Sequence, residues 1–395
     1  MRHFSPNVLL SLAALLLTNH LQAKPLQVYI LAGQSNMQGH AKISTFEHIG
    51  MDPATKPMLA DMLGPDGKPK VCERVWISSI GCSGDDTTEQ TGKLSAGFGA
   101  STEKIGPEFT FGLYMEKSTD APILLIKTSW GGKSLNTDFR PPGAGPYAFS
   151  ETQLAALQKK GKDIATIKAD KAEETGVYYR LMIEHVKKVI GDIKRVVPEY
   201  DAAQGYELAG FAWFQGWNDL VDHGTYPNRD KPGGYDDYST SMACFIRDVR
   251  KDLNAPKLPF VIGVLGVGGP SVPSDKPDPK VNLRSAMVAP TLLPEFKGNV
   301  AAVMTEKYWD LELDAACAKR DKIKQQAKKP AAKGKKAAAE DKAALDKLLA
   351  EGLTDRERLV IEKGASNQGY HYLGSAKILG GIGKGLAESM IQLKK

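Results

Sequence analysis

A serine that follows a short apolar run has the setting needed for nucleophilic catalysis. The run over residues 26–32 has the length and composition of a buried strand, and the sequence GQSNM follows it at residues 33–37. A serine at such a strand-to-helix turn projects its hydroxyl above the sheet edge, where a base can reach it. The nucleophile-elbow pattern of α/β-hydrolases is not met, because Met37 stands where that pattern needs glycine. Taken alone, the segment equally fits a Ser35 that caps the next helix.

The segment VYILAGQSNMQG, residues 28–39, resembles the first sequence block of the SGNH-hydrolase superfamily. The resemblance is to the branch of sialate O-acetylesterases and related carbohydrate esterases of the family 6 type. Three further blocks follow in the family's order, at residues 128–133, 214–219 and 369–372. The resemblance implies a three-layer α/β sandwich of the flavodoxin-like kind, with a mostly parallel central sheet. It also implies a serine esterase that removes O-acetyl groups from a carbohydrate without a metal or organic cofactor, with Ser35 as nucleophile.

The last block supplies the expected catalytic base. In the family a histidine precedes the final helix, and His371 in the sequence GYHY occupies that position. A histidine there would take the proton of the serine hydroxyl and return it to the leaving sugar. By contrast, His185 lies on the apolar stripe of a predicted helix, which favours a role in the core.

The second and third blocks supply the expected oxyanion donors. In TSWGGK, residues 128–133, the resemblance assigns the backbone N–H of Gly132 to the substrate oxygen, with Gly131 as the near alternative. In FQGWND, residues 214–219, the side chain of Asn218 would donate a second hydrogen bond, and the N–H of Ser35 a third.

Four residues beside these positions are expected to contact substrate. Trp217 stands where the family usually has glutamate, and since an indole cannot accept a proton, we expect it to form an apolar or sugar-stacking wall. The other three are Gln34, Trp130 and Gln215.

The acid that should orient the base is missing from its usual position. The family commonly places aspartate three residues before the histidine, and here that residue is Gln368, preceded by Asn367. A glutamine oxygen would stabilise the imidazolium less than a carboxylate does. Three outcomes stay open: a dyad helped by Gln368 or by a backbone carbonyl, weak or lost activity, or a carboxylate from elsewhere. The candidates for that carboxylate are Asp219, Glu362 and Glu108, of which Asp219 and Glu108 also fit structural roles near helix starts.

Short apolar runs alternate with helical patterns along the chain, which predicts an α/β fold with a mostly parallel sheet covered on both faces. The predicted strands span residues 28–32, 75–79, 123–128, 208–214, 260–267 and 300–305. The predicted helices span residues 178–197, 238–253 and 374–393.

Residues 24–395 are predicted to form one esterase domain with two insertions. The first, residues 151–176, is charged and is expected to carry a surface helix. The second, residues 319–350, is rich in lysine and alanine, and its centre KKPAAKGKK is predicted to be a basic, partly disordered hinge between helical arms. It is either a solvated insertion or a contact for an acidic polysaccharide. Because much of the net charge of +6 lies there, nucleic acid is not an expected partner.

The first residues have the pattern of a secretory signal. A basic start, an apolar stretch at residues 8–17 and a small residue at position 23 predict a signal peptide over residues 1–23. The mature protein is therefore expected in the periplasm or outside the cell, with no transmembrane anchor. Export permits disulfides, and Cys72 and Cys82 could close a small loop. No cysteine or histidine spacing suggests a metal site.

Two functions remain open from the sequence. The intact nucleophile and oxyanion blocks favour an exported carbohydrate esterase. The neutral residue at position 368 supports the alternative, a catalytically weak or inactive carbohydrate-binding protein on the same fold.

Overall fold

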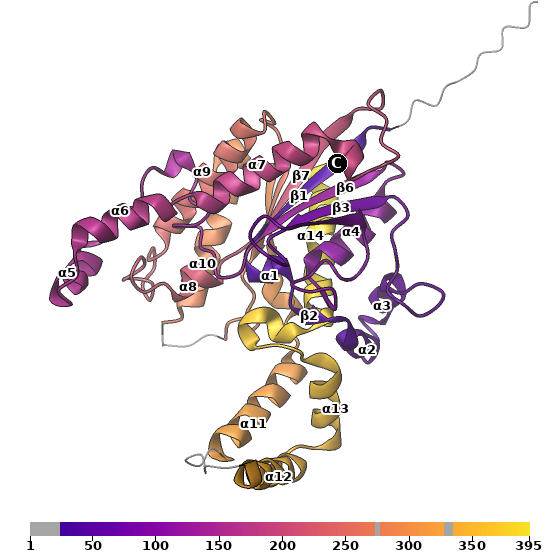
Figure 1. Ribbon diagram of the computed structural model, residues 1–395, viewed down its shortest axis with the longest axis vertical. Helices are drawn as coiled ribbons and strands as arrows, with labels where there is room; N and C mark the ends of the chain where they lie inside the picture. The colour runs from indigo at the N-terminus through magenta and orange to yellow at the C-terminus, as the bar shows by residue number, and fades with distance from the viewer. Residues whose placement is uncertain (1–23, 273–276, 328–334) are drawn as a thin grey trace, which may run out of the picture.

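The computed structural model describes residues 24–272, 277–327 and 335–395 (Figure 1). The predicted signal peptide and residues 328–334 of the lysine-rich insertion lie outside the described residues. A seven-stranded sheet runs in the order β4-β3-β6-β1-β7-β8-β9. All neighbours in it are parallel except β4, which pairs antiparallel with β3. This architecture confirms the predicted α/β fold class. The strands are β1 (Leu26–Gly33), β3 (Val75–Ile80), β4 (Glu89–Lys93), β6 (Ile123–Ser129), β7 (Tyr206–Phe214), β8 (Phe260–Val264) and β9 (Val300–Met304).

The six predicted strands are all present, because each is an apolar run that the sheet buries. The last two are shorter than predicted, since β8 ends at Val264 and β9 at Met304. The sequence pattern missed β4, whose residues EQTGK are polar or glycine. A strand at the edge of a sheet is partly exposed to solvent and can be polar, so hydropathy alone does not reveal it. A further small pairing joins β2 (Ala41–Lys42) to β5 (Lys104–Ile105).

Helices cover both faces of the sheet (Figure 1). Alternate residues of β7 show the two layers: Trp213 packs against Phe245 of α9 (Asp236–Asp252), with ring centroids 4.5 Å apart. Gly210 instead faces Met390 of α14 (Ala376–Leu393), where a Cβ would lie 2.3 Å from the sulfur. α4 (Pro107–Ser118) packs beside α14, and α7 (Val177–Gly191) lies on the side of α9.

The predicted helices match α7, α9 and α14, although the first of them ends at Gly191 and continues as a short 3-10 turn, η3 (Ile193–Arg195). Four more short helices lie close to the sheet or its connections. They are α1 (Ser35–Gln38), α2 (Phe46–Gly50), α3 (Lys56–Met62) and α8 (Trp217–Val221). A longer one, α10 (Pro279–Val288), precedes β9, and the 3-10 turn η7 (Gly369–Gly374) precedes α14.

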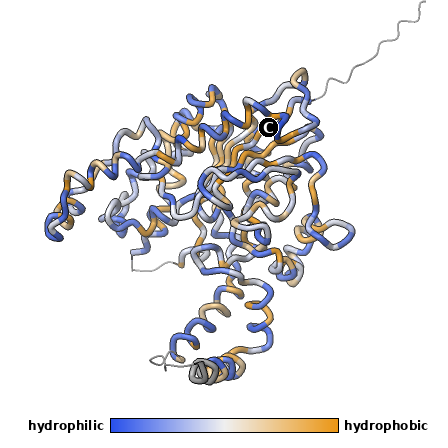
Figure 2. Tube along the Cα trace, viewed as in Figure 1, coloured by the Kyte–Doolittle hydropathy of each residue, from blue (hydrophilic) through white to orange (hydrophobic). Residues whose placement is uncertain are grey.

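Both insertions project from the body as helices (Figure 1). The charged insertion forms two helices, α5 (Glu151–Lys159) and α6 (Ile164–Glu174), where one was expected. The second forms part of an arm of α11 (Leu311–Ala327), α12 (Lys335–Gly352) and α13 (Asp355–Gly364). Ion pairs between α11 and α13 hold the arm together, Lys319 with Glu357 and Arg356 with Glu312. Figure 2 shows the hydrophobic residues gathered in the sheet and hydrophilic residues along the projecting helices.

All four cysteines are free, so the disulfide loop considered for Cys72 and Cys82 is not present. Both thiols are buried, and burial raises the pKa of Cys72 far above its usual value. Among the described helices, none combines the length and apolar character needed to cross a membrane.

Candidate functional site

Three of the four sequence blocks meet at the carboxyl edge of the sheet. Gly33 at the end of β1 is in register with Ser129 at the end of β6 and with Phe214 at the end of β7. The segments that follow these three strands therefore emerge side by side. They carry Ser35, Gly132 and Asn218, so the parallel register gathers residues that lie far apart in the sequence. Ligands of open α/β sheets commonly bind at this edge.

Ser35 is the first residue of α1 and is 7% exposed. The turn before it requires glycine, because a Cβ on Gly33 would lie 2.1 Å from the carbonyl oxygen of Phe214. Gln34 then links this turn to the third block: its Oε1 accepts hydrogen bonds from the N–H of Gly216 at 3.1 Å and of Asn218 at 3.3 Å. Gln34 is 1% exposed, and its Nε2 has no partner among the described residues. The side-chain oxygen of Gln34 thus joins the turn before Ser35 to the third block.

A buried ion pair holds the other end of α1. Lys127, on β6, donates to Glu108 Oε2 at 2.8 Å, and both side chains are fully buried. The same ammonium donates to the carbonyl oxygens of Gln38 at 2.8 Å and Phe98 at 2.7 Å. Burial raises the pKa of Glu108, and the lysine charge opposes that shift. Glu108 is therefore occupied with Lys127 and does not orient His371.

The predicted oxyanion donors lie on the open side of Ser35. Gly131 and Gly132 are exposed, and a Cβ on Gly131 would lie 4.0 Å from Ser35 Cβ. Gly132 has a φ of +76°, and nothing lies within 4 Å of the position of its absent Cβ. Among the hydrogen bonds of the described residues, none engages the side-chain amide of Asn218. These groups are available to a substrate oxygen.

Asp219 is held in place elsewhere and does not reach the base, contrary to one of the expected roles. It is fully buried and accepts five hydrogen bonds. The donors are Leu135 N, Asn136 N, Asn136 Nδ2, Gln215 Nε2 and Tyr226 OH, at 2.5–3.1 Å. Burial raises the pKa of Asp219, while these donors favour the charged form. These bonds join the third block to Leu135 and Asn136, in the segment that follows the second block.

The amide that contacts the base belongs to Asn367, and not to Gln368 as expected. His371 Nδ1 lies 3.1 Å from Asn367 Oδ1. An Nδ1–H that donates to this oxygen leaves Nε2 free to accept a proton. The side chain of Gln368 is exposed, and this residue supports the loop through its backbone. Its carbonyl oxygen accepts hydrogen bonds from the N–H groups of His371 and Leu373, both at 3.0 Å.

A strained turn brings Asn367 to the ring. Tyr372 and Leu373, directly after His371, have φ values of 53° and 59°, which non-glycine residues rarely adopt. Such strain costs about 1–3 kcal/mol per residue and persists only where neighbouring contacts enforce it. Here the N–H groups of Ser366 and Asn367 both donate to the carbonyl oxygen of Leu373. The hydroxyl of Tyr372 accepts from Gly266 N at 2.8 Å.

Aromatic rings pack beside the imidazole of His371. His40 stacks on His371 with ring centroids 4.0 Å apart and an angle of 3° between the planes. The ring of Tyr370 lies edge-on to that of His371, with centroids 4.5 Å apart, and its centroid is 5.8 Å from that of Trp217. Burial, followed by the charge of Lys104, lowers the pKa of His371 from 6.5 to about 4. Its imidazole is therefore neutral, as a general base must be, at any pH well above 4.

Three of the four residues expected to contact substrate, namely Gln34 described above, Trp130 and Gln215, are buried instead. Trp130 is 1% exposed, and its indole N–H donates to the carbonyl oxygen of Asp86 at 2.9 Å. Gln215 is 2% exposed, and its amide is used by Asp219, Lys133 and Tyr238. Neither Trp130 nor Gln215 offers a free surface to a substrate, so both support the site from within the core. Trp217 is half-buried beside Tyr370, which leaves it able to form the expected wall.

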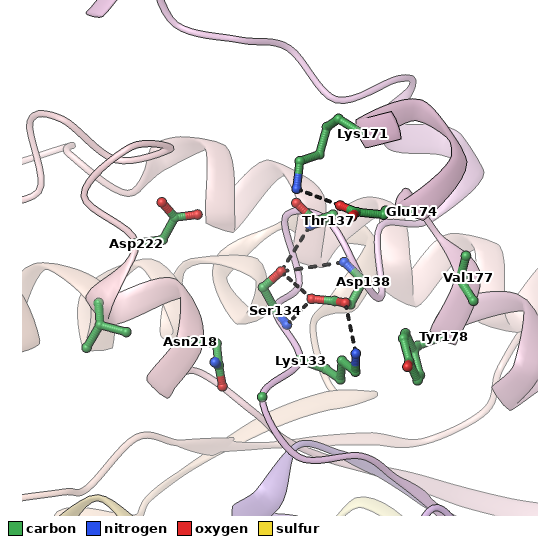
Figure 3. Close-up of a pocket in the computed structure, with 12 residues that line it drawn as sticks. Lys133, Ser134, Thr137, Asp138, Lys171, Glu174, Val177, Tyr178, Asn218 and Asp222 are labelled. Atoms are coloured by element: carbon green, nitrogen blue, oxygen red, sulfur yellow. Dashed lines mark hydrogen bonds and ion pairs between the residues drawn. The ribbon is translucent and has the colours of Figure 1, made fainter. Parts of the chain in front are cut away.

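A pocket of about 630 Å³ opens beside the oxyanion donors (Figure 3). Gly132 and Asn218 are among its lining residues, and Lys171 and Glu174 of α6 line it across from Asn218. The close-up shows Ser134 and Asp138 joined by hydrogen bonds at its centre, with Lys133 and Tyr178 beside them. Asp138 Oδ2 accepts from Ser134 N at 2.8 Å and from Ser134 Oγ at 2.9 Å.

Sequence reasoning missed Asn367 and His40 as neighbours of the base. His40 follows Ser35 by five residues, so the sequence predicts that the two lie near each other. Its stacking on His371 is a tertiary contact that spacing does not reveal. Asn367 was overlooked because the family spacing pointed to the next residue. The strained turn after His371 shifts the contact by one position.

A serine at a strand-to-helix turn, a neutral histidine before the last helix and free N–H donors between them are the parts that serine esterases use. The family model of SASA, described as carbohydrate esterase, sialic acid-specific acetylesterase, matches residues 25–282. The chain belongs to this family of carbohydrate esterases. Among curated proteins, none matched the chain.

The solved structures that resemble the chain include the following three. A protein from Arabidopsis thaliana is 17% identical, with a TM-score of 0.39, and the match covers 71% of this chain and 86% of that one. A novel carbohydrate acetylesterase from Xanthomonas citri is 14% identical, with a TM-score of 0.38 and coverage of 70% and 49%. NanS is 13% identical, with a TM-score of 0.36 and coverage of 71% and 78%.

Proposed function

We propose that the protein is an exported serine esterase that removes O-acetyl groups from a carbohydrate. Ser35 Oγ attacks the acetyl carbonyl while His371 Nε2 takes its proton. The oxyanion is bound by the N–H groups of Ser35 and Gly132 and by the side chain of Asn218. The C–O bond to the sugar then breaks as His371 protonates the leaving sugar oxygen, and water releases acetate from the acetylated Ser35 by the same steps in reverse.

The observation that carries this proposal is the alignment of Gly33, Ser129 and Phe214 at one edge of the sheet. It brings the segments of Ser35, Gly132 and Asn218 to the same edge, and α1 lies against η7, which carries His371; this arrangement supports their proposed roles. Family membership supports the carbohydrate ester as substrate class. Export rests on the signal-like pattern of residues 1–23.

In place of a triad carboxylate, we propose that Asn367 orients the imidazole. Its neutral amide fixes the ring but stabilises the imidazolium less than a carboxylate would. Among the described residues, no hydrogen bond joins Ser35 Oγ to His371. Catalytic hydrogen bonds are often long before substrate binds, so the pair would close in the complex.

Two features favour the alternative, a carbohydrate-binding protein with little or no activity. They are the neutral amide beside His371 and the absence of a hydrogen bond between Ser35 Oγ and His371 among the described residues. Acetate release from p-nitrophenyl acetate and from acetylated glycans separates the two functions. We expect wild type to be active and Ser35→Ala and His371→Ala each to lose activity by about 10⁴-fold or more. His223→Ala, which changes an exposed histidine, is the matched control. Wild type that binds glycans without turnover would establish the binding protein instead.

A further inference from the structure

The pocket beside the oxyanion donors is much larger than an acetyl group requires. Its volume of about 630 Å³ lies within the range of whole-ligand sites in proteins. Gly132 and Asn218 place its edge beside the predicted position of the reacting carbonyl. The part of the substrate that remains after the acetyl group, the sugar, is what this space would hold.

The charged insertion forms one wall of this pocket. Lys171 and Glu174 come from α6, and Asp222 approaches from the opposite side, in the loop after α8 (Figure 3). Asp222 accepts hydrogen bonds from the N–H groups of Gly224 at 3.0 Å and Thr225 at 2.9 Å. An insertion that appeared only as a surface feature in the sequence thus takes part in the site.

The charges that line the pocket leave no lysine free for an anion. Two lysines and three carboxylates line it, which gives a sum of minus one: Lys133, Lys171, Asp138, Glu174 and Asp222. Lys133 is 3.7 Å from Asp138 and lies over the ring of Tyr178 at 4.0 Å. Lys171 is 3.0 Å from Glu174. In the described part of the chain, no lysine or arginine forms an ion pair with Asp222.

We propose that this pocket binds the sugar that carries the ester and selects a neutral, hydroxyl-rich saccharide over one that bears a carboxylate. Sugar hydroxyls can donate to Asp138 and Asp222, whereas a carboxylate on the sugar would meet these acids without a free cation. The inference rests on the proposed esterase function. It narrows the substrate class away from the acidic sugar named in the family description.

The test uses one sugar in two charge states, O-acetylated N-acetylneuraminic acid and its carboxyl methyl ester. We expect wild type to release acetate from the methyl ester with a kcat/KM about tenfold higher than from the acid, because like charges repel at a specific site. Equal values, or a preference for the acid, would overturn the proposal. Hydrolysis of p-nitrophenyl acetate with turnover of neither sugar would also overturn it, while leaving the esterase itself intact.

A pair of charge reversals on one helix assigns the selectivity to the pocket wall. Glu174→Lys changes the lining from minus one to plus one, and it should reduce or invert the preference for the methyl ester. Glu173→Lys makes the same change of net charge on the exposed side of α6, outside the pocket, and should leave the preference as in wild type. Equal shifts in both variants would show a long-range effect of net charge and contradict the assigned wall.

Discussion

The two sides of the candidate site are held by different kinds of interaction. On the nucleophile side, α1 is tied to the sheet by the buried Lys127–Glu108 pair and by Gln34, which bonds to the end of β7. On the side of the proposed base, the contacts of His371 are one neutral amide, that of Asn367, and the stacked ring of His40.

This difference indicates where the sequence can change with least effect on the fold. The nucleophile side is part of the core, because its supporting residues are buried and two of them, Lys127 and Glu108, form an ion pair. The base side lies on a loop whose orienting group is half-buried and uncharged. Variants on the first side should therefore affect folding together with activity, and variants on the second side should affect activity alone.

The largest effect should follow from breaking the buried ion pair. Lys127→Met leaves Glu108 buried without its partner, and it should lower the free energy of unfolding by about 3–5 kcal/mol. Chemical denaturation measures this change, with Lys187→Met, at an exposed lysine of α7, as the control. The double variant Lys127→Met/Glu108→Gln should recover part of the loss. A single variant as stable as wild type would show that the pair does not anchor this side.

A somewhat smaller effect should follow from removing an oxyanion donor. Asn218→Ala should lower kcat on p-nitrophenyl acetate by about 100- to 1000-fold, because the amide acts only on the charge that develops in the reaction. Its thermal unfolding should stay close to wild type, since the Asn218 side chain is in none of the hydrogen bonds among the described residues. A rise in KM with kcat unchanged, or a loss of stability alone, would remove Asn218 from the oxyanion site.

The smallest change should be a gain on the base side. Asn367→Asp places a carboxylate at the ring, which should stabilise the imidazolium and raise kcat by about tenfold near neutral pH. The same charge should raise the pKa of His371 from about 4, so the acid limb of kcat/KM should move to higher pH.

Two variants control this experiment. Asn367→Ala should reduce activity, and Gln368→Ala, at an exposed side chain, should leave it near wild type. If Gln368→Ala instead has the larger effect, the contact with Asn367 does not orient the base.

Much of the fold could be predicted because its central strands contain apolar runs, such as residues 123–126 of β6, that a doubly covered sheet must bury. Because these strands are parallel, the blocks that follow them meet at the carboxyl edge of the sheet. Side-chain direction could not be predicted in the same way. Gln34, Trp130 and Gln215 belong to the expected segments but are buried. Asp219 is occupied by five hydrogen-bond donors, three of which come from Leu135 and Asn136, far away in the sequence.

The orienting residue could not be predicted because its contact depends on a strained backbone. Spacing along the chain pointed to Gln368, whereas the positive φ values at Tyr372 and Leu373 fold the loop so that Asn367 reaches the imidazole. No local propensity favours those conformations for tyrosine or leucine. They are imposed by packing, such as the bond between Gly266 and Tyr372.

The projecting arm of α11, α12 and α13 has a consequence for how the chain could be divided. Ser35 lies before the arm in the sequence, and His371 lies after it, next to α14, which packs against α4 in the core. A chain cut within the arm would therefore place the nucleophile on one fragment and the base on the other. Such fragments would form a split enzyme, whose activity reports their reassociation through α14.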